Sequence, residues 1–143
     1  APGPGFTSPP GEDGGADGPE PALPELPGFD LQPLLARVRN NRRLVWKLLE
    51  SYVETEGVTA AELDELLRAK HFEQVRLRTH SLMGSAAALG ATQVALSSKA
   101  LNHALRSNPG EETPQLRMLA DRLTEALRAS ISAAQAALAR HQD

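Results

Sequence analysis

Apolar residues recur every three or four positions from Asp30 to the end of the chain, and no segment alternates between apolar and polar residues. The three- and four-residue spacing places apolar side chains along one side of a helix, whereas alternation is typical of a strand. Glycine, proline and asparagine interrupt this spacing at intervals and indicate where helices begin and end. The pattern therefore predicts an all-α chain from Asp30 onward.

Three helices are predicted in the first half of this region. Asp30 is placed to cap a short first helix, and the asparagine pair at positions 40–41 to start a second that ends at Gly57. The run Thr59-Ala60-Ala61-Glu62 resembles a capping box. It predicts a third, short helix from there to about residue 68.

Three longer helices follow. The first spans about residues 71–89 and stops at Gly90, the second spans about residues 92–107 and stops at Asn108-Pro109-Gly110, and the last starts near Thr113-Pro114. Short connections between amphipathic helices force neighbouring helices to be antiparallel. We therefore expect an antiparallel up-down four-helix bundle with one or two short accessory helices near its N-terminal end.

Residues 1–25 differ in composition from the rest of the chain. Proline, glycine, aspartate and glutamate dominate there, and Phe6 is the only sizeable apolar side chain before Leu23. Such a segment buries too little surface to offset its ordering entropy. We predict a flexible Pro/Gly-rich linker over residues 1–25 and one helical domain over residues 26–143, cut from the end of a longer protein.

Charge and composition exclude several classes of function. The chain of 143 residues has a net charge of −3 and no basic block longer than Arg42-Arg43, which disfavours binding of nucleic acid. It has no cysteine, so disulfides and thiolate metal sites are excluded. No apolar run approaches the roughly 20 residues of a membrane span, and the start has no signal-peptide pattern. We expect a soluble chain without direct membrane contact, and the lack of cysteine fits a reducing compartment such as the cytoplasm, our expected location.

His80 is the most informative residue, because it faces away from the apolar stripe of its predicted helix. That stripe consists of Phe72, Val75, Thr79, Leu82, Ala86 and Leu89. Gly84 follows one turn after His80 and leaves the ring uncovered. Since glycine inside a helix costs about 0.5–1 kcal/mol relative to alanine, it indicates a need for access to the ring. Close approach of a neighbouring helix is the alternative explanation.

The surface around His80 is predicted to be small, mostly apolar and suited to docking another protein. It consists of Arg76, Leu77, Met83, Gly84 and Ala87. Neutral imidazole is a nucleophile near physiological pH and forms a phosphoramidate that can pass its phosphoryl group to a carboxylate. The other histidines have no His or carboxylate partner at a persuasive metal-ligand spacing, so we predict no metal site.

The stretch from His80 to Gly90 resembles the phosphoacceptor helix of histidine-containing phosphotransfer (HPt) domains. The family pattern reads His-x-Leu-Lys-Gly-Ser-(Ala/Ser)-x-x-x-Gly, and the chain departs from it only at Met83. Upstream, Leu26-Pro27-Gly28-Phe29-Asp30 is similar to the Leu-Pro-Gly-Ile-Asp lead-in of these domains. Downstream, Leu101-Asn102 falls where the family usually carries Leu-Glu or Leu-Gln.

This resemblance implies a phosphorelay intermediate of two-component signal transduction. His80 would accept a phosphoryl group from the aspartate of one receiver domain and pass it to another receiver or response regulator. The domain would be a monomeric module of a hybrid sensor histidine kinase, without ATP-dependent kinase activity of its own. It would bind no cofactor, because the receiver supplies the Mg²⁺.

Three further residues acquire a candidate role from the resemblance. Asn102 would hydrogen-bond the His80 ring, or would be an ordinary polar residue on a helix flank. Because Met83 replaces the family's lysine, Arg76 is the first candidate to neutralise the phosphoryl group and Lys99 the second. The departure at Met83 also keeps open a non-catalytic, degenerate HPt-like adaptor that docks receivers. A bundle that dimerises through its last helix is a third interpretation.

Overall fold

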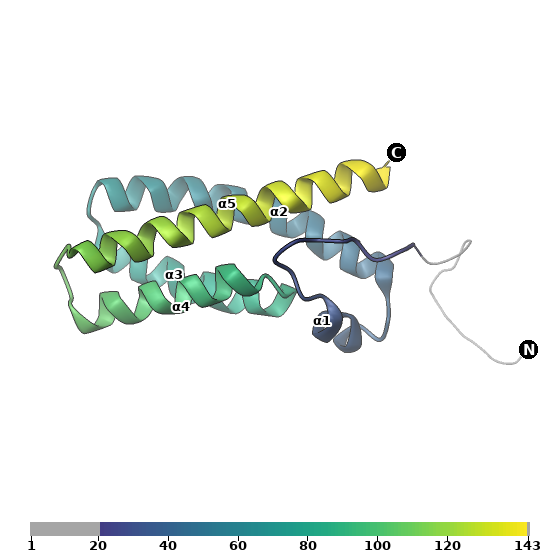
Figure 1. Cartoon of the computed structure of the whole chain (residues 1–143), viewed down its shortest axis with the longest axis horizontal. Coiled ribbons are helices and arrows are strands. Elements are labelled where there is room, and N and C mark those ends of the chain that lie inside the picture. The colour runs from purple at the N-terminus through teal and green to yellow at the C-terminus, as the bar shows by residue number, and fades with distance from the viewer. Residues whose placement is uncertain (1–20, 143) are drawn as a thin grey trace, which may run out of the picture.

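The computed structural model describes residues 21–142, which form five helices and no strand. The helices are α1 (Gln32–Arg37), α2 (Arg42–Arg68), α3 (Phe72–Leu89), α4 (Thr92–Ser107) and α5 (Pro114–Gln142). Helices α2 to α5 run antiparallel in succession, and α5 returns to lie beside α2 (Figure 1). The predicted all-α four-helix bundle is confirmed.

The core runs the length of the bundle and is built mostly from aliphatic side chains. Helix α3 packs on α2 and α4, and α5 packs on the same two helices, so α3 and α5 occupy opposite corners. The largest fully buried apolar side chains are Leu49, Leu63, Leu82, Leu101, Leu123, Leu127, Val45, Val75 and Val94. Each such burial contributes about 1.5–3 kcal/mol, which holds the four helices together and leaves their outer faces to solvent.

Three residues predicted to start or end helices do so in the structure. Asn41 caps α2, with its Oδ1 accepting a hydrogen bond from Leu44 N (3.1 Å). Gly90 ends α3 in the left-handed conformation. At the start of α5, Thr113 Oγ1 accepts a hydrogen bond from Leu116 N (3.0 Å). Local side-chain and backbone preferences therefore set these boundaries.

Helix α2 is continuous, so the predicted break at Gly57 and the separate third helix are wrong. Thr59 Oγ1 donates to the Thr55 carbonyl oxygen one turn earlier (3.2 Å) instead of capping a new helix. Side chains of one face are buried on both sides of the glycine, from Tyr52 to Leu63. Their burial outweighs the helical cost of glycine, about 0.5–1 kcal/mol. The described chain therefore has one accessory helix, α1.

Helix α1 is short and is fastened to the end of α3. Leu31 occupies its N-cap position, one residue after the predicted cap, and Asp30 Oδ1 accepts a hydrogen bond from Gln32 N (3.2 Å). The Arg37 guanidinium donates to the carbonyl oxygen of Ala88. This contact satisfies a carbonyl in the last turn of α3, where a cation is favourable.

The segment before α1 clamps the turn between α3 and α4. Asp30 N donates to Gly90 O (2.8 Å), and Thr92 N donates to Gly28 O (3.2 Å). Gly90 has a φ of +94°, and a Cβ at this position would clash with the Asp30 carbonyl group. Both the conformation and the close approach require glycine. The lead-in segment therefore fixes where α3 ends and α4 begins.

Residues 1–20 of the predicted linker lie outside the described residues. The chain contacts the bundle from Ala22 onward: the Trp46 indole donates to the Ala22 carbonyl oxygen (2.9 Å), and Leu23 packs against the core. Trp46 also stacks on His141 near the end of α5, with ring centroids 3.8 Å apart. Packing therefore begins before residue 26, the predicted start of the domain.

We predict that Gly57→Ala raises the free energy of unfolding by about 0.5–1 kcal/mol. Helix α2 is continuous there, and an added Cβ would meet nothing within 4 Å. Gly90→Ala is the control, and it should be strongly destabilising because of the positive φ and the clash with Asp30. Urea unfolding measures both. A destabilised Gly57→Ala protein would contradict a continuous α2.

Candidate functional site

His80 is exposed in the middle of α3. The buried stripe of this helix consists of Val75, Thr79, Leu82, Ala86 and Leu89, with Phe72 half-buried at its start. Because the core takes that side of α3, the imidazole stays open to solvent and to an approaching protein.

Gly84 lies on the same outer side, one turn after His80. An added Cβ would meet no atom within 4 Å, so no neighbouring helix approaches this glycine. The alternative explanation for Gly84, close helix packing, is therefore wrong. Around it, Leu77 is 54% exposed, Ala87 is exposed and Met83 is half-buried. The structure thus places the predicted docking residues together on one open face of α3.

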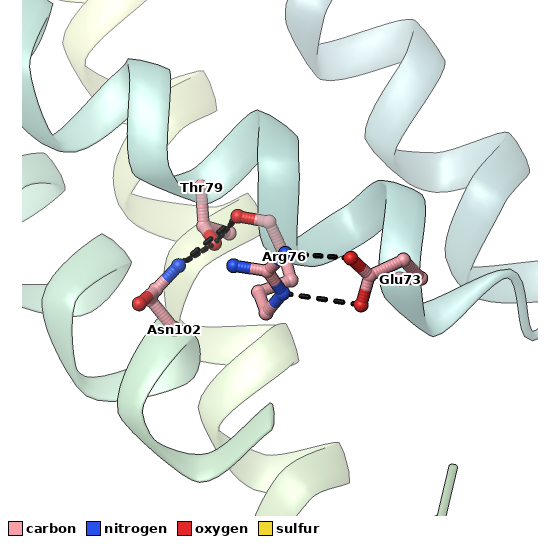
Figure 2. Close-up of polar contacts among 4 residues, drawn as sticks. All are labelled: Glu73, Arg76, Thr79 and Asn102. Carbon is pink, nitrogen blue, oxygen red and sulfur yellow. Dashed lines mark hydrogen bonds and ion pairs between the residues drawn. The ribbon is translucent and has the colours of Figure 1, made fainter. Parts of the chain in front are cut away.

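Arg76 is bonded to Glu73 and not directed at His80. Its Nε lies 3.1 Å from Glu73 Oε1 and its Nη2 lies 2.5 Å from Glu73 Oε2, one turn towards the start of α3 (Figure 2). The hydrogen bonds from Arg76 lower the pKa of the Glu73 carboxyl, and those to Glu73 raise the pKa of Arg76. The first of the two predicted cations therefore already has a counter-ion.

Asn102 is buried between α4 and α3, immediately beside the turn that carries His80. Its Nδ2 donates to the Arg76 carbonyl oxygen (3.0 Å) and to Thr79 Oγ1 (3.1 Å), and Thr79 Oγ1 donates to the same carbonyl (2.9 Å) (Figure 2). In this structure the amide thus holds the α3 backbone and the residue preceding His80, and not the ring itself. Its predicted contact with the imidazole stays a prediction.

Lys99 lies on the α3 side of α4, because it precedes Asn102 by three residues and shares its face. The pairing of Thr79 with Asn102 across antiparallel helices puts Lys99 at about the height of Leu82, between His80 and Met83. Lys99 is exposed, and within residues 21–142 it takes part in no ion pair. Of the two predicted cations, Lys99 is therefore the one with uncompensated charge.

Two residues of the structure are not identified from the sequence, Leu96 on α4 and Glu56 on α2. Leu96 is 61% exposed on the outer side of α4, two residues from the buried Val94 and Ser98. The periodicity of α4 alone would have found it. Ser85 donates from Oγ to Oε2 of Glu56 (3.2 Å), a carboxylate buried in α2. No local signal marks Glu56, because its burial follows from the packing of α2 on α3.

The described residues contain no group of three or more His, Asp or Glu side chains that could hold a metal ion. His71 and His103 are exposed and stand apart from His80 in sequence, and His141 lies against Trp46. No helix between residues 21 and 142 is both long and apolar enough to cross a bilayer.

A family model described as the Hpt domain matches residues 47–137, which is more than half of the chain. The matched region contains His80 and the residues that surround it on α3 and α4, and it begins inside α2, after the lead-in segment and α1. Comparison with curated proteins and with solved structures finds no match.

We predict that Asn102→Ala lowers the free energy of unfolding by about 1–3 kcal/mol, because it removes both hydrogen bonds of a buried amide and leaves a gap between the helices. The exposed neighbour provides the control: His103→Ala should stay within about 0.5 kcal/mol of the wild type. Chemical unfolding of both variants measures the difference. Equal stabilities would show that the amide does not join α4 to α3 in solution.

Proposed function

The chain belongs to the Hpt domain family, and we propose that His80 is its phosphoacceptor. Hpt domains carry out phosphotransfer in two-component signalling and interact with receiver domains. In this proposal His80 takes a phosphoryl group from the aspartate of one receiver and passes it to another receiver or response regulator.

The exposed His80 ring beside Gly84 is the observation that carries the proposal. A ring nitrogen of neutral His80 attacks the phosphorus of the aspartyl phosphate. The nitrogen–phosphorus bond forms while the acyl oxygen–phosphorus bond breaks, so the aspartate leaves as a carboxylate and the other ring nitrogen gives its proton to water. Such an attack needs an open path to the ring, and the missing side chain at Gly84 provides it. The Mg²⁺ of the reaction comes with the receiver.

Lys99 is the cation that we assign to the phosphoryl group. The group carries close to two negative charges. Lys99, at about the height of Leu82, takes part in no ion pair within residues 21–142, whereas Arg76 is held by Glu73. An exposed pairing of this kind is worth about 0.2–1 kcal/mol, or a several-fold change in the phosphotransfer equilibrium. Met83, where the family carries lysine, therefore weakens the phosphorylated state without eliminating it.

The receiver docks on the apolar face around His80. Leu77, Met83, Gly84 and Ala87 form its α3 part, and Leu96 extends it onto α4 at about the height of Ser85. Leu77 and Leu96 are 54% and 61% exposed, and apolar side chains gathered on one face favour a protein–protein contact. The flexible thioether of Met83 adapts to a partner surface and suits the same face.

We predict that His80→Gln abolishes acceptance of phosphoryl groups while leaving the helical content and the melting temperature nearly unchanged, because the side chain is exposed. The test incubates the full chain with a phosphorylated receiver domain and Mg²⁺ and then measures acid-labile label. His103→Gln, which removes another exposed histidine, should accept normally. Label retained on His80→Gln would refute the assignment, and a wild-type chain that binds receivers without accepting label would establish the adaptor function instead.

We further predict that Lys99→Gln lowers the phosphorylated fraction at equilibrium severalfold and that Met83→Lys raises it severalfold. Both effects should shrink at high salt, because the charges are exposed. Arg76→Gln should change the fraction less than Lys99→Gln, since Glu73 already compensates Arg76. The phosphotransfer equilibrium against one receiver, measured at low and high salt, decides between the two cations. A larger loss in Arg76→Gln would reverse the assignment.

A further inference from the structure

One end of the molecule carries a concentration of positive charge. Residues 31–49 contain five cations and no acidic residue, although the net charge of the whole chain is −3. We call these five residues the basic corner: Arg37, Arg39, Arg42, Arg43 and Lys47. All are exposed except Arg42, which is half-buried, and they lie on α1, the α1–α2 turn and the first turns of α2.

The contact with Ala88 explains Arg37, but the fold does not account for the charges of Arg39, Arg42 and Lys47. Arg42 and Arg43 occupy the first turn of α2, where the helix dipole disfavours cations and no acidic residue is present. Arg39 has a φ of +56°, a conformation that suits asparagine or glycine better than arginine. Within the described part of the chain, Arg39, Arg42 and Lys47 form no ion pair. Positive charge is thus kept at positions where folding favours other residues.

The basic corner is continuous with the face that carries His80. Arg37 contacts the Ala88 carbonyl oxygen in the last turn of α3, and Figure 1 shows α1 beside the turn between α3 and α4. Ala88 follows His80 by eight residues, or about 12 Å along the helix axis. Between them the outer face of α3 carries the exposed residues Gly84 and Ala87 and the half-buried Met83. A partner seated over His80 therefore reaches the basic corner along the docking face of α3.

We infer that the basic corner attracts the acidic surface around the phosphoacceptor aspartate of the receiver domain. This inference rests on the proposed function. The receiver's aspartate and the carboxylates that hold its Mg²⁺ make that surface anionic, so its charge is complementary to the corner. Because the screening length is about 8–10 Å at 0.1–0.15 M salt, the corner acts on the rate of encounter, most strongly at low salt. Chemistry at His80 is unaffected.

The test uses two double variants that each remove two positive charges from the full chain. Arg39→Asn/Arg42→Gln removes two of the five charges of the basic corner, and asparagine tolerates the positive φ at position 39. Arg122→Gln/Arg128→Gln removes the same charge from α5, at the corner of the bundle opposite α3. Rapid-mixing kinetics measure transfer from a phosphorylated receiver domain at two salt concentrations. Screening of charges is weak at about 20 mM salt and strong at about 500 mM salt.

We expect Arg39→Asn/Arg42→Gln to lower kcat/KM for transfer about three- to tenfold at low salt, with unchanged kcat and no difference at high salt. The α5 variant should match the wild type. Equal loss in both variants, or none in either, would overturn the inference and leave His80 as phosphoacceptor. The inference would also be overturned if Arg39→Asn/Arg42→Gln lost binding to vesicles containing phosphatidylserine while its transfer rate stayed unchanged, since the corner would then bind a membrane. A wild-type chain that accepts no phosphoryl group would instead refute the proposed function.

Discussion

The close approach of the Asp30 backbone to Gly90 is the contact on which the arrangement of the site depends. No side chain fits at position 90, and the hydrogen bond from Asp30 N to Gly90 O (2.8 Å) ties the start of the bundle to the turn between α3 and α4. This turn sets the height of α4 against α3. The pairing of Asn102 with Thr79 follows from that height, and so does the height of Lys99, one turn before Asn102.

The reactive side chain costs the fold very little. His80 contributes nothing to the core, because Thr79 and Leu82 fill the buried side of the same turns. Its surroundings are instead held from behind: Asn102 bonds the backbone at Arg76, and Ser85 bonds the buried Glu56 of α2. The helix is thus held in place from its buried side, and the imidazole remains open to contact with a partner. That arrangement suits the phosphoacceptor role proposed for His80.

The sequence predicts those features that depend on local chemistry. Helix ends marked by Asn41 and Gly90 and the outward direction of His80 follow from capping, backbone conformation and periodicity. The predicted helix end at Gly57 is wrong, because a glycine does not end a helix when side chains on both sides of it are buried on one continuous helical face. The partners of Arg76 and Asn102 depend on side-chain reach and on the height of α4 against α3. The hydrophobic periodicity contains neither, so only the structure shows that Arg76 already has a counter-ion.

The central claim is that the imidazole of His80 carries the phosphoryl group. Phosphorus NMR of the full chain, after incubation with a phosphorylated receiver and Mg²⁺, tests it most directly. The account predicts one phosphoramidate resonance that couples to the ring protons of His80 and disappears on acidification. A resonance that couples to another histidine, or no phosphoramidate while the receiver loses its phosphoryl group to water, would contradict it.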